Sequence, residues 1–114
     1  MSDLSSEKCV PCKGDTPPLK GEELQRFWKR LEEGWELVNE KAIEKSFQFK
    51  DFKEALAFVN DIGKVAEEEG HHPDIVLSWG KVKVVYTTHK IQGLSESDFV
   101  MAAKTDVCYI SRKS

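Results

Sequence analysis

The chain has 114 residues, which is the length of one ordinary domain rather than two. Its 17 basic and 20 acidic residues give a formal net charge of −3, which argues against direct binding to a nucleic-acid backbone. The sequence contains neither an apolar run long enough for a membrane helix nor a basic-then-apolar leader. We therefore expect a cytoplasmic protein that does not associate with membranes.

The first 18 residues are typical of a flexible tail, because they contain three prolines and few apolar side chains. We expect the folded domain to span residues 19–114. Cys9 and Cys12 form a C-x-x-C pair in this tail. A redox-active pair would open a helix in a βαβ unit, and a zinc site would need a second pair of ligands. The favoured interpretation is therefore two exposed thiols without a fixed partner.

Apolar spacing predicts the first helix and the first clear strand. A helix is expected from Gly21 to Glu33, with Gly34 just past its end. Its apolar face has residues at i, i+3, i+4 and i+7: Leu24, Phe27, Trp28 and Leu31. The alternation of apolar and polar residues from Ile43 to Phe49 predicts a half-buried strand.

A second helix is predicted from Phe52 to Glu69, where apolar residues recur at three and four positions over four turns. Gly70 can take the left-handed conformation that ends such a helix. A hairpin follows, with strands over residues 75–78 and 82–89. Its turn is either Trp79-Gly80 or Gly80-Lys81. An indole exposed at this turn would be a candidate interface or ligand contact.

The third helix is predicted to begin after Leu94. Ser95 and Asp98 fit a capping box, and Leu94 and Phe99 are spaced as a hydrophobic staple. Its buried face is expected to continue through four residues: Val100, Ala103, Val107 and Ile110. This order of elements predicts a single α+β domain with an antiparallel four-stranded sheet and helices packed on one face. An open sheet edge would favour strand-to-strand dimerisation.

The three histidines of the chain are the candidates for chemistry. Either hairpin register places His89 opposite Gly70 or His72, within a residue or two of the His71-His72 pair. Imidazole can give or take a proton near neutral pH, which general acid–base catalysis requires. Glu67 lies four residues before His71, a spacing at which its carboxylate could face that imidazole.

Structural interpretations compete with the catalytic ones. Asp98 could add a second carboxylate to the histidines, but it could equally serve only as a helix cap. Glu67 belongs to an acidic run, and such runs are usually a solvated face. Zinc is the rival use of the histidines; adjacent imidazoles tend to point apart, and no H-x-x-x-H pair or nearby cysteine supports a metal site.

Several motifs together resemble the pterin-4a-carbinolamine dehydratase family, and the resemblance covers about residues 8–110. The specific combination is Glu67-x-x-x-His71-His72-Pro73, Thr88-His89 and Gly93-Leu94-Ser95-Glu96-x-Asp98. Supporting similarities are Gly34-Trp35, Phe47-x-Phe49-Lys50-Asp51-Phe52, and the leader Cys-Val-Pro-Cys followed by Thr16-Pro17-Pro18-Leu19. One departure is Ile75, where many members carry an aromatic residue that could stack on a pterin.

The resemblance implies a reaction and a set of roles. It implies dehydration of 4a-hydroxytetrahydropterin to quinonoid dihydropterin, which recycles the pterin of aromatic amino acid hydroxylases without a metal or a bound cofactor. His71 and His89 would transfer protons, and His72 would orient the pterin ring. Glu67 would pair with or polarise a histidine, and Asp98 would support the site from the third helix.

The resemblance also implies a homodimer or homotetramer. An alternative function is a non-catalytic binding or assembly protein, or a transcriptional coactivator, on the same fold. The intact set of three histidines favours the enzyme over that alternative.

Overall fold

The computed structural model describes residues 18–31, 33–88 and 91–113. Four strands form one antiparallel sheet in the order β1-β2-β4-β3. The elements, in chain order, are α1 (Gly21–Lys29), β1 (Glu36–Val38), β2 (Ala42–Gln48), α2 (Phe52–Glu69), β3 (Asp74–Ser78), β4 (Lys81–Tyr86) and α3 (Glu96–Lys113).

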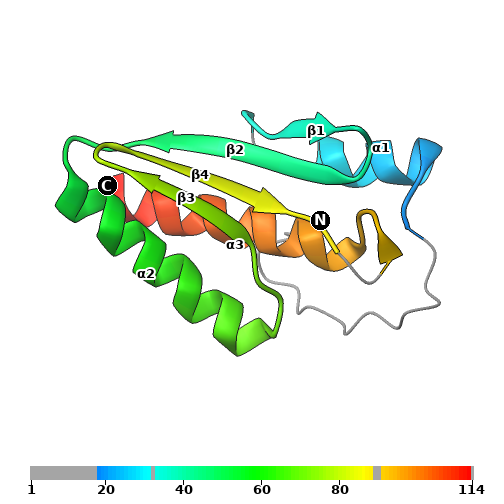
Figure 1. The fold of residues 1–114 in the computed structure, drawn as a ribbon. Coiled ribbons are helices and arrows are strands. Elements are labelled where there is room, and N and C mark those ends of the chain that lie inside the picture. Colours follow the sequence, from blue (N-terminus) through cyan, green and yellow to red (C-terminus); the bar gives the residue numbers. More distant parts are fainter. Residues whose placement is uncertain (1–17, 32, 89–90, 114) are drawn as a thin grey trace.

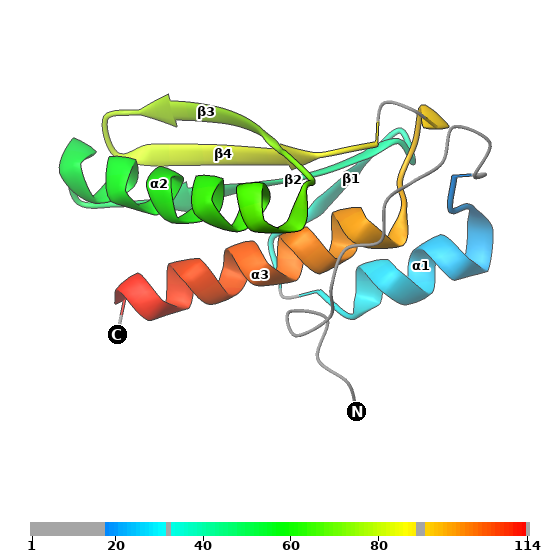
Figure 2. The same ribbon diagram turned by 90° about the horizontal axis from the view of Figure 1, so that it is seen from below.

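The three helices form a single layer against one face of the sheet (Figures 1 and 2). The predicted fold class is therefore confirmed. The core lies between the two layers, where side chains from the inner face of β2 and β4 meet those of α2 and α3. Within the described residues, no helix is both long and apolar enough to cross a membrane.

The helix α2 has the predicted bounds, because both of its ends are fixed by local interactions. Asp51 is the N-cap, and its side chain accepts a hydrogen bond from the backbone N–H of Glu54 at 2.9 Å. Gly70 ends the helix with a left-handed φ of 68°. The buried stripe of the helix consists of Ala55, Phe58, Ile62 and Ala66.

The hairpin turn is Trp79-Gly80, because Ser78 pairs with Lys81 in the register of β3 and β4. The second strand is shorter than predicted and ends at Tyr86. Beyond it, Thr88 forms an isolated antiparallel bridge with Gly93, outside the ladder of β3 and β4.

The first helix is also shorter than predicted: it ends at Lys29 and not at Glu33. The indole N–H of Trp28 donates to the carbonyl of Trp35 at 3.0 Å, which holds the chain after the helix close to the last helical turn. Gly34 lies in this connection with a φ of 105°. The connection between α1 and β1 places the side chain of Trp35 in the core, where the residue is 4 % exposed.

The predicted buried face of α3 is correct in its first half and wrong in its second. Val100 is buried and Ala103 is half-buried. Val107 and Ile110, in contrast, are 47 % and 56 % exposed. The helix is rotated relative to the orientation that its apolar residues predicted.

Buried polar contacts explain this rotation. Asp106 is 4 % exposed and accepts hydrogen bonds from Trp35 Nε1 at 2.8 Å and Lys45 Nζ at 2.7 Å. At the preceding residue of the helix, the hydroxyl of Thr105 lies 2.7 Å from that of Tyr86. A polar face of α3 therefore meets the sheet, because partners on β2, β4 and the α1–β1 connection satisfy its hydrogen bonds.

Replacing Gly63 by alanine should stabilise the protein. Gly63 lies inside α2, and a Cβ there would have no atom within 4 Å. We expect Gly63→Ala to raise the free energy of unfolding by about 0.5–1 kcal/mol, measured by urea denaturation. The contrasting variant Gly70→Ala should lose about 1 kcal/mol, because alanine is strained at a φ of 68°. A destabilised Gly63→Ala variant would contradict the expectation.

Asp106→Ala should destabilise the protein strongly. It removes the shared acceptor of the Trp35 indole and the Lys45 ammonium, whose side chain is only 15 % exposed. We expect a loss of about 3 kcal/mol in the free energy of unfolding by urea denaturation. Asp74→Ala, at an exposed carboxylate, is the control and should change stability by less than about 0.5 kcal/mol. Equal effects of the two variants would rule out the structural role of Asp106.

Candidate active site

Two of the three candidate histidines occupy the short connection between α2 and β3. The helix ends at Gly70, whose backbone N–H donates to the carbonyl of Ala66. The backbone N–H of His71 donates to the same carbonyl at 3.3 Å. His72 and Pro73 follow, and β3 begins at the next residue. The imidazoles therefore sit on a short, hydrogen-bonded link between two packed elements.

His71 contacts Asp98, which lies 27 residues later in the sequence. Its Nε2 lies 2.6 Å from Oδ1 of Asp98, and the side chains are 16 % and 0 % exposed. Asp98 lies in the first turn of α3, so the pair joins the end of α2 to the start of α3. The helix N-terminus carries a partial positive charge that favours a carboxylate at this position.

The second oxygen of Asp98 is the helix cap. Oδ2 accepts from the backbone N–H of Ser95 at 2.9 Å and from the hydroxyl of Thr88 at 2.7 Å. This bond to Ser95 is one half of the predicted capping box. The two interpretations that the sequence left open for Asp98 are therefore compatible, because each carboxylate oxygen serves one of them.

The donors around Asp98 indicate which ring nitrogen of His71 carries the proton. Besides His71, Asp98 receives N–H or O–H donors from Thr88 and Ser95, which suits an ionised carboxylate that can only accept. Nε2 of His71 is then the protonated ring nitrogen. Nδ1 carries the lone pair and can take up a proton.

Pro18 and Leu19, which precede α1 and are called the N-terminal strap here, contact the segment that carries Ser95. The hydroxyls of Thr88 and Ser95 lie 2.9 Å apart. The backbone N–H of Leu19 donates to the carbonyl of Leu94 at 2.8 Å, one residue before Ser95. Gly93 faces the strap closely, because a Cβ at this position would lie 2.6 Å from Cβ of Pro18. The N-terminal strap therefore supports the segment that carries the donors to Asp98.

His72 pairs with Glu67, which corrects the pairing expected from sequence. Nε2 of His72 lies 2.5 Å from Oε2 of Glu67. The spacing of four residues had favoured His71 as the partner of Glu67. The helix ends at Gly70, however, and the backbone turns His71 towards α3. The side chains of His72 and Glu67 are 58 % and 79 % exposed, so solvent screens this pair.

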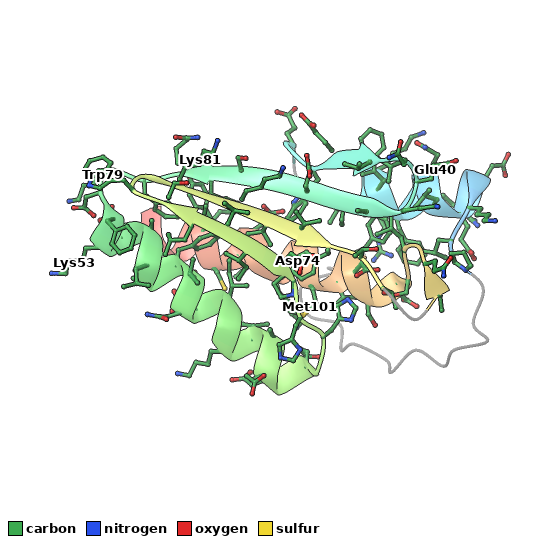
Figure 3. All side chains as sticks on the ribbon, in the orientation of Figure 1. Glu40, Lys53, Asp74, Trp79, Lys81 and Met101 are labelled. Atoms are coloured by element: carbon green, nitrogen blue, oxygen red, sulfur yellow. The ribbon has the colours of Figure 1, made fainter. Side chains whose placement is uncertain are left out.

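Other singled-out residues lie away from these pairs or outside the described part of the chain. Trp79 is 68 % exposed, at the opposite end of β3 from Asp74 (Figure 3). The site lies at the Asp74 end, where the α2–β3 link enters the strand. His89, Cys9 and Cys12 fall outside the described residues.

The sequence pattern did not indicate the contacts that Thr88 and Tyr86 make with Asp98 and His71. Thr88 entered only through the Thr88-His89 motif, although its hydroxyl donates to Asp98. Tyr86 lies against His71, with 6.3 Å between the ring centroids. The alternation of β4 could have placed Tyr86 on the inner face of the sheet, but nothing in the sequence indicated its neighbour.

Asp98→Asn should destabilise the protein, because an amide has one acceptor oxygen where three donors converge on two. We expect a loss of about 2 kcal/mol in the free energy of unfolding, measured by urea denaturation. Asp51→Asn is the matched control, because asparagine caps a helix as well as aspartate does. A loss that is equally small in both variants would show that the donors around Asp98 do not depend on its charge.

Comparisons with known proteins identify the family to which the chain belongs. The family model described as pterin 4 alpha carbinolamine dehydratase matches residues 17–108. A relative from Alkaliphilus metalliredigens is 56 % identical over 106 residues, covering 93 % of this chain and 96 % of the relative. One from Rubrobacter xylanophilus is 57 % identical over 106 residues, covering 93 % and 98 %. Both carry the name of this family.

Solved structures share the fold. The crystal structure of a transcriptional coactivator/pterin dehydratase from Brucella melitensis has a TM-score of 0.75 and 33 % identity, covering 81 % of this chain and 98 % of that one. A pterin dehydratase-like protein identified as a RuBisCO assembly factor of the alpha-carboxysome has a TM-score of 0.58 and 22 % identity, covering 67 % and 89 %. This second likeness concerns the fold alone. By its sequence and its fold, the chain belongs to the pterin-4-alpha-carbinolamine dehydratase family.

Proposed function

We propose that this protein is a hydro-lyase that dehydrates 4a-hydroxytetrahydropterin to quinonoid dihydropterin, recycling the pterin of aromatic amino acid hydroxylases. Membership of the family supports the substrate class and the reaction. The fold by itself does not decide the chemistry, since a neighbour of 22 % identity is a RuBisCO assembly factor. Two adjacent histidines that each contact a carboxylate favour the enzyme.

The reaction needs groups that move protons in both directions. The bond between C4a and the hydroxyl oxygen breaks, and the oxygen leaves as water after it receives a proton. A ring nitrogen next to C4a loses its proton, and a carbon–nitrogen double bond forms. No electrons pass to or from another molecule. Imidazoles suit both proton transfers, because they exchange protons readily at neutral pH.

The pair of His71 and Asp98 is the observation that carries the proposal. Asp98 holds the proton on Nε2, so Nδ1 of His71 is directed to accept a proton from the substrate. A half-buried imidazole paired with a buried carboxylate is typical of a general base whose orientation is fixed. His72 is more exposed and, paired with Glu67, would orient the pterin ring. The role of His89 as the second proton-transfer group rests on the resemblance of the Thr88-His89 motif.

The direct test is an assay of dehydration. A phenylalanine hydroxylase generates 4a-hydroxytetrahydropterin, and ultraviolet absorbance follows its conversion to the quinonoid form. We expect the wild-type protein to accelerate this step over the spontaneous rate. The double variant His71→Ala, His89→Ala should lose at least about 100-fold in kcat, because it lacks both proton-transfer groups.

Glu68→Gln is the control, because it neutralises a carboxylate of the same acidic run that we assign no role. This variant should keep the wild-type rate. A folded wild-type protein that leaves the spontaneous rate unchanged would contradict the enzyme proposal. The leading function would then be the non-catalytic binding or assembly role.

A further inference from the structure

Behind His71 lies a buried tyrosine that the proposed chemistry does not use. Tyr86 is the last residue of β4 and is 0 % exposed. Its ring is nearly parallel to the His71 imidazole, with 6.3 Å between the centroids and 13° between the planes. This geometry is within the range of offset stacking between aromatic rings. The ring of Tyr86 therefore packs beside the imidazole in an offset, nearly parallel arrangement.

The position of the Tyr86 ring is itself fixed by α3. Its hydroxyl lies 2.7 Å from Oγ1 of Thr105, which donates its own proton to the carbonyl of Met101 at 2.8 Å. The Tyr86 hydroxyl is therefore the donor to Thr105. Trp35 packs against the same ring, at 6.1 Å between centroids. The Tyr86 side chain is therefore held rigidly, because its hydroxyl is hydrogen-bonded and its ring is packed.

The hydrogen bond to Asp98 alone does not define the orientation of His71. A single N–H···O contact fixes one edge of the imidazole but permits the ring to turn about the axis of that bond. Packing against the nearly parallel ring of Tyr86 restricts this rotation. Together, the hydrogen bond to Asp98 and the packing against Tyr86 hold the ring at two places. Nδ1 is then presented in one direction.

We propose that Tyr86 is a positioning residue for His71, which it holds in the orientation that presents Nδ1 to the pterin. The proposal rests on the proposed function. Tyr86 is fully buried, so it acts through His71 and does not touch the substrate.

Three variants separate positioning from packing. Tyr86→Leu removes the stacked ring, whereas Tyr86→Phe keeps the ring and removes only the hydroxyl. Phe58→Leu is the matched control, because Phe58 is also 0 % exposed but packs against Phe47, Phe49 and Tyr109. If Tyr86→Leu does not fold, Tyr86→Met replaces it, since a flexible thioether fills more of the space.

We expect Tyr86→Leu to lower kcat about tenfold, because a loosely oriented base spends less time in the reactive geometry. Its KM should stay within about twofold, since substrate contacts are retained. Phe58→Leu should keep kcat within about twofold of the wild type, and Tyr86→Phe should lose less kcat than Tyr86→Leu, because it keeps the ring but loses the hydrogen bond to Thr105. A control that loses as much kcat as Tyr86→Leu would overturn the proposal, because any loss of a core ring would then have the same effect.

Nuclear magnetic resonance of labelled histidines gives a readout that does not depend on activity. Losing the stacked ring should move the ring-proton signals of His71 and mix its two tautomers, while the signals of His72 stay in place. A wild type without dehydratase activity would overturn the proposed function, and this role of Tyr86 with it. An active wild type whose Tyr86→Leu variant keeps both its kcat and its His71 signals would overturn the Tyr86 proposal alone.

Discussion

The buried carboxylate of Asp98 is the constraint on which the site depends. One of its oxygens accepts from Ser95, just before α3, and from Thr88, after β4. The other contacts His71, in the connection between α2 and β3. A buried carboxylate that lost these donors would be costly, so the three segments cannot shift independently. The interaction that begins α3 is therefore also the one that orients His71. The Asp98 carboxylate therefore both stabilises the start of α3 and contacts a residue of the candidate site.

The rotation of α3 about its own axis determines the direction in which the Asp98 carboxylate points. Thr105 lies two helical turns after Asp98, on the same face of the helix, and Asp106 is its neighbour. Their hydrogen bonds to Tyr86, Trp35 and Lys45 are directional, so they favour one rotation of the helix over others that an apolar stripe would permit. That rotation points Asp98 at the end of α2. It also leaves apolar side chains at the C-terminal end of α3 in contact with solvent.

The outer parts of the sheet are less constrained. The edge strands are β1 and β3, and the described helices cover only one face (Figure 2). Val76 on β3 is 57 % exposed, and Trp79 at the hairpin turn is more exposed still. An apolar edge of this kind fits the strand-to-strand association expected from the sequence, and the homo-oligomer stays a prediction. The candidate site lies at the opposite end of β3 from Trp79 (Figure 3).

The sequence by itself determined the elements whose signals are local. The helix α2 has the predicted bounds because its period, its Asp51 cap and its Gly70 stop lie within one continuous stretch, and the hairpin follows from two neighbouring strands, although only the register decided between its two possible turns. Only the tertiary structure decided which carboxylate contacts His71, which contacts His72, and how α3 is rotated. These choices depend on polar contacts between residues far apart in the chain, such as His71 with Asp98 and Trp35 with Asp106. Periodicity cannot reveal such contacts, because it registers which face is apolar and not which buried polar groups satisfy one another.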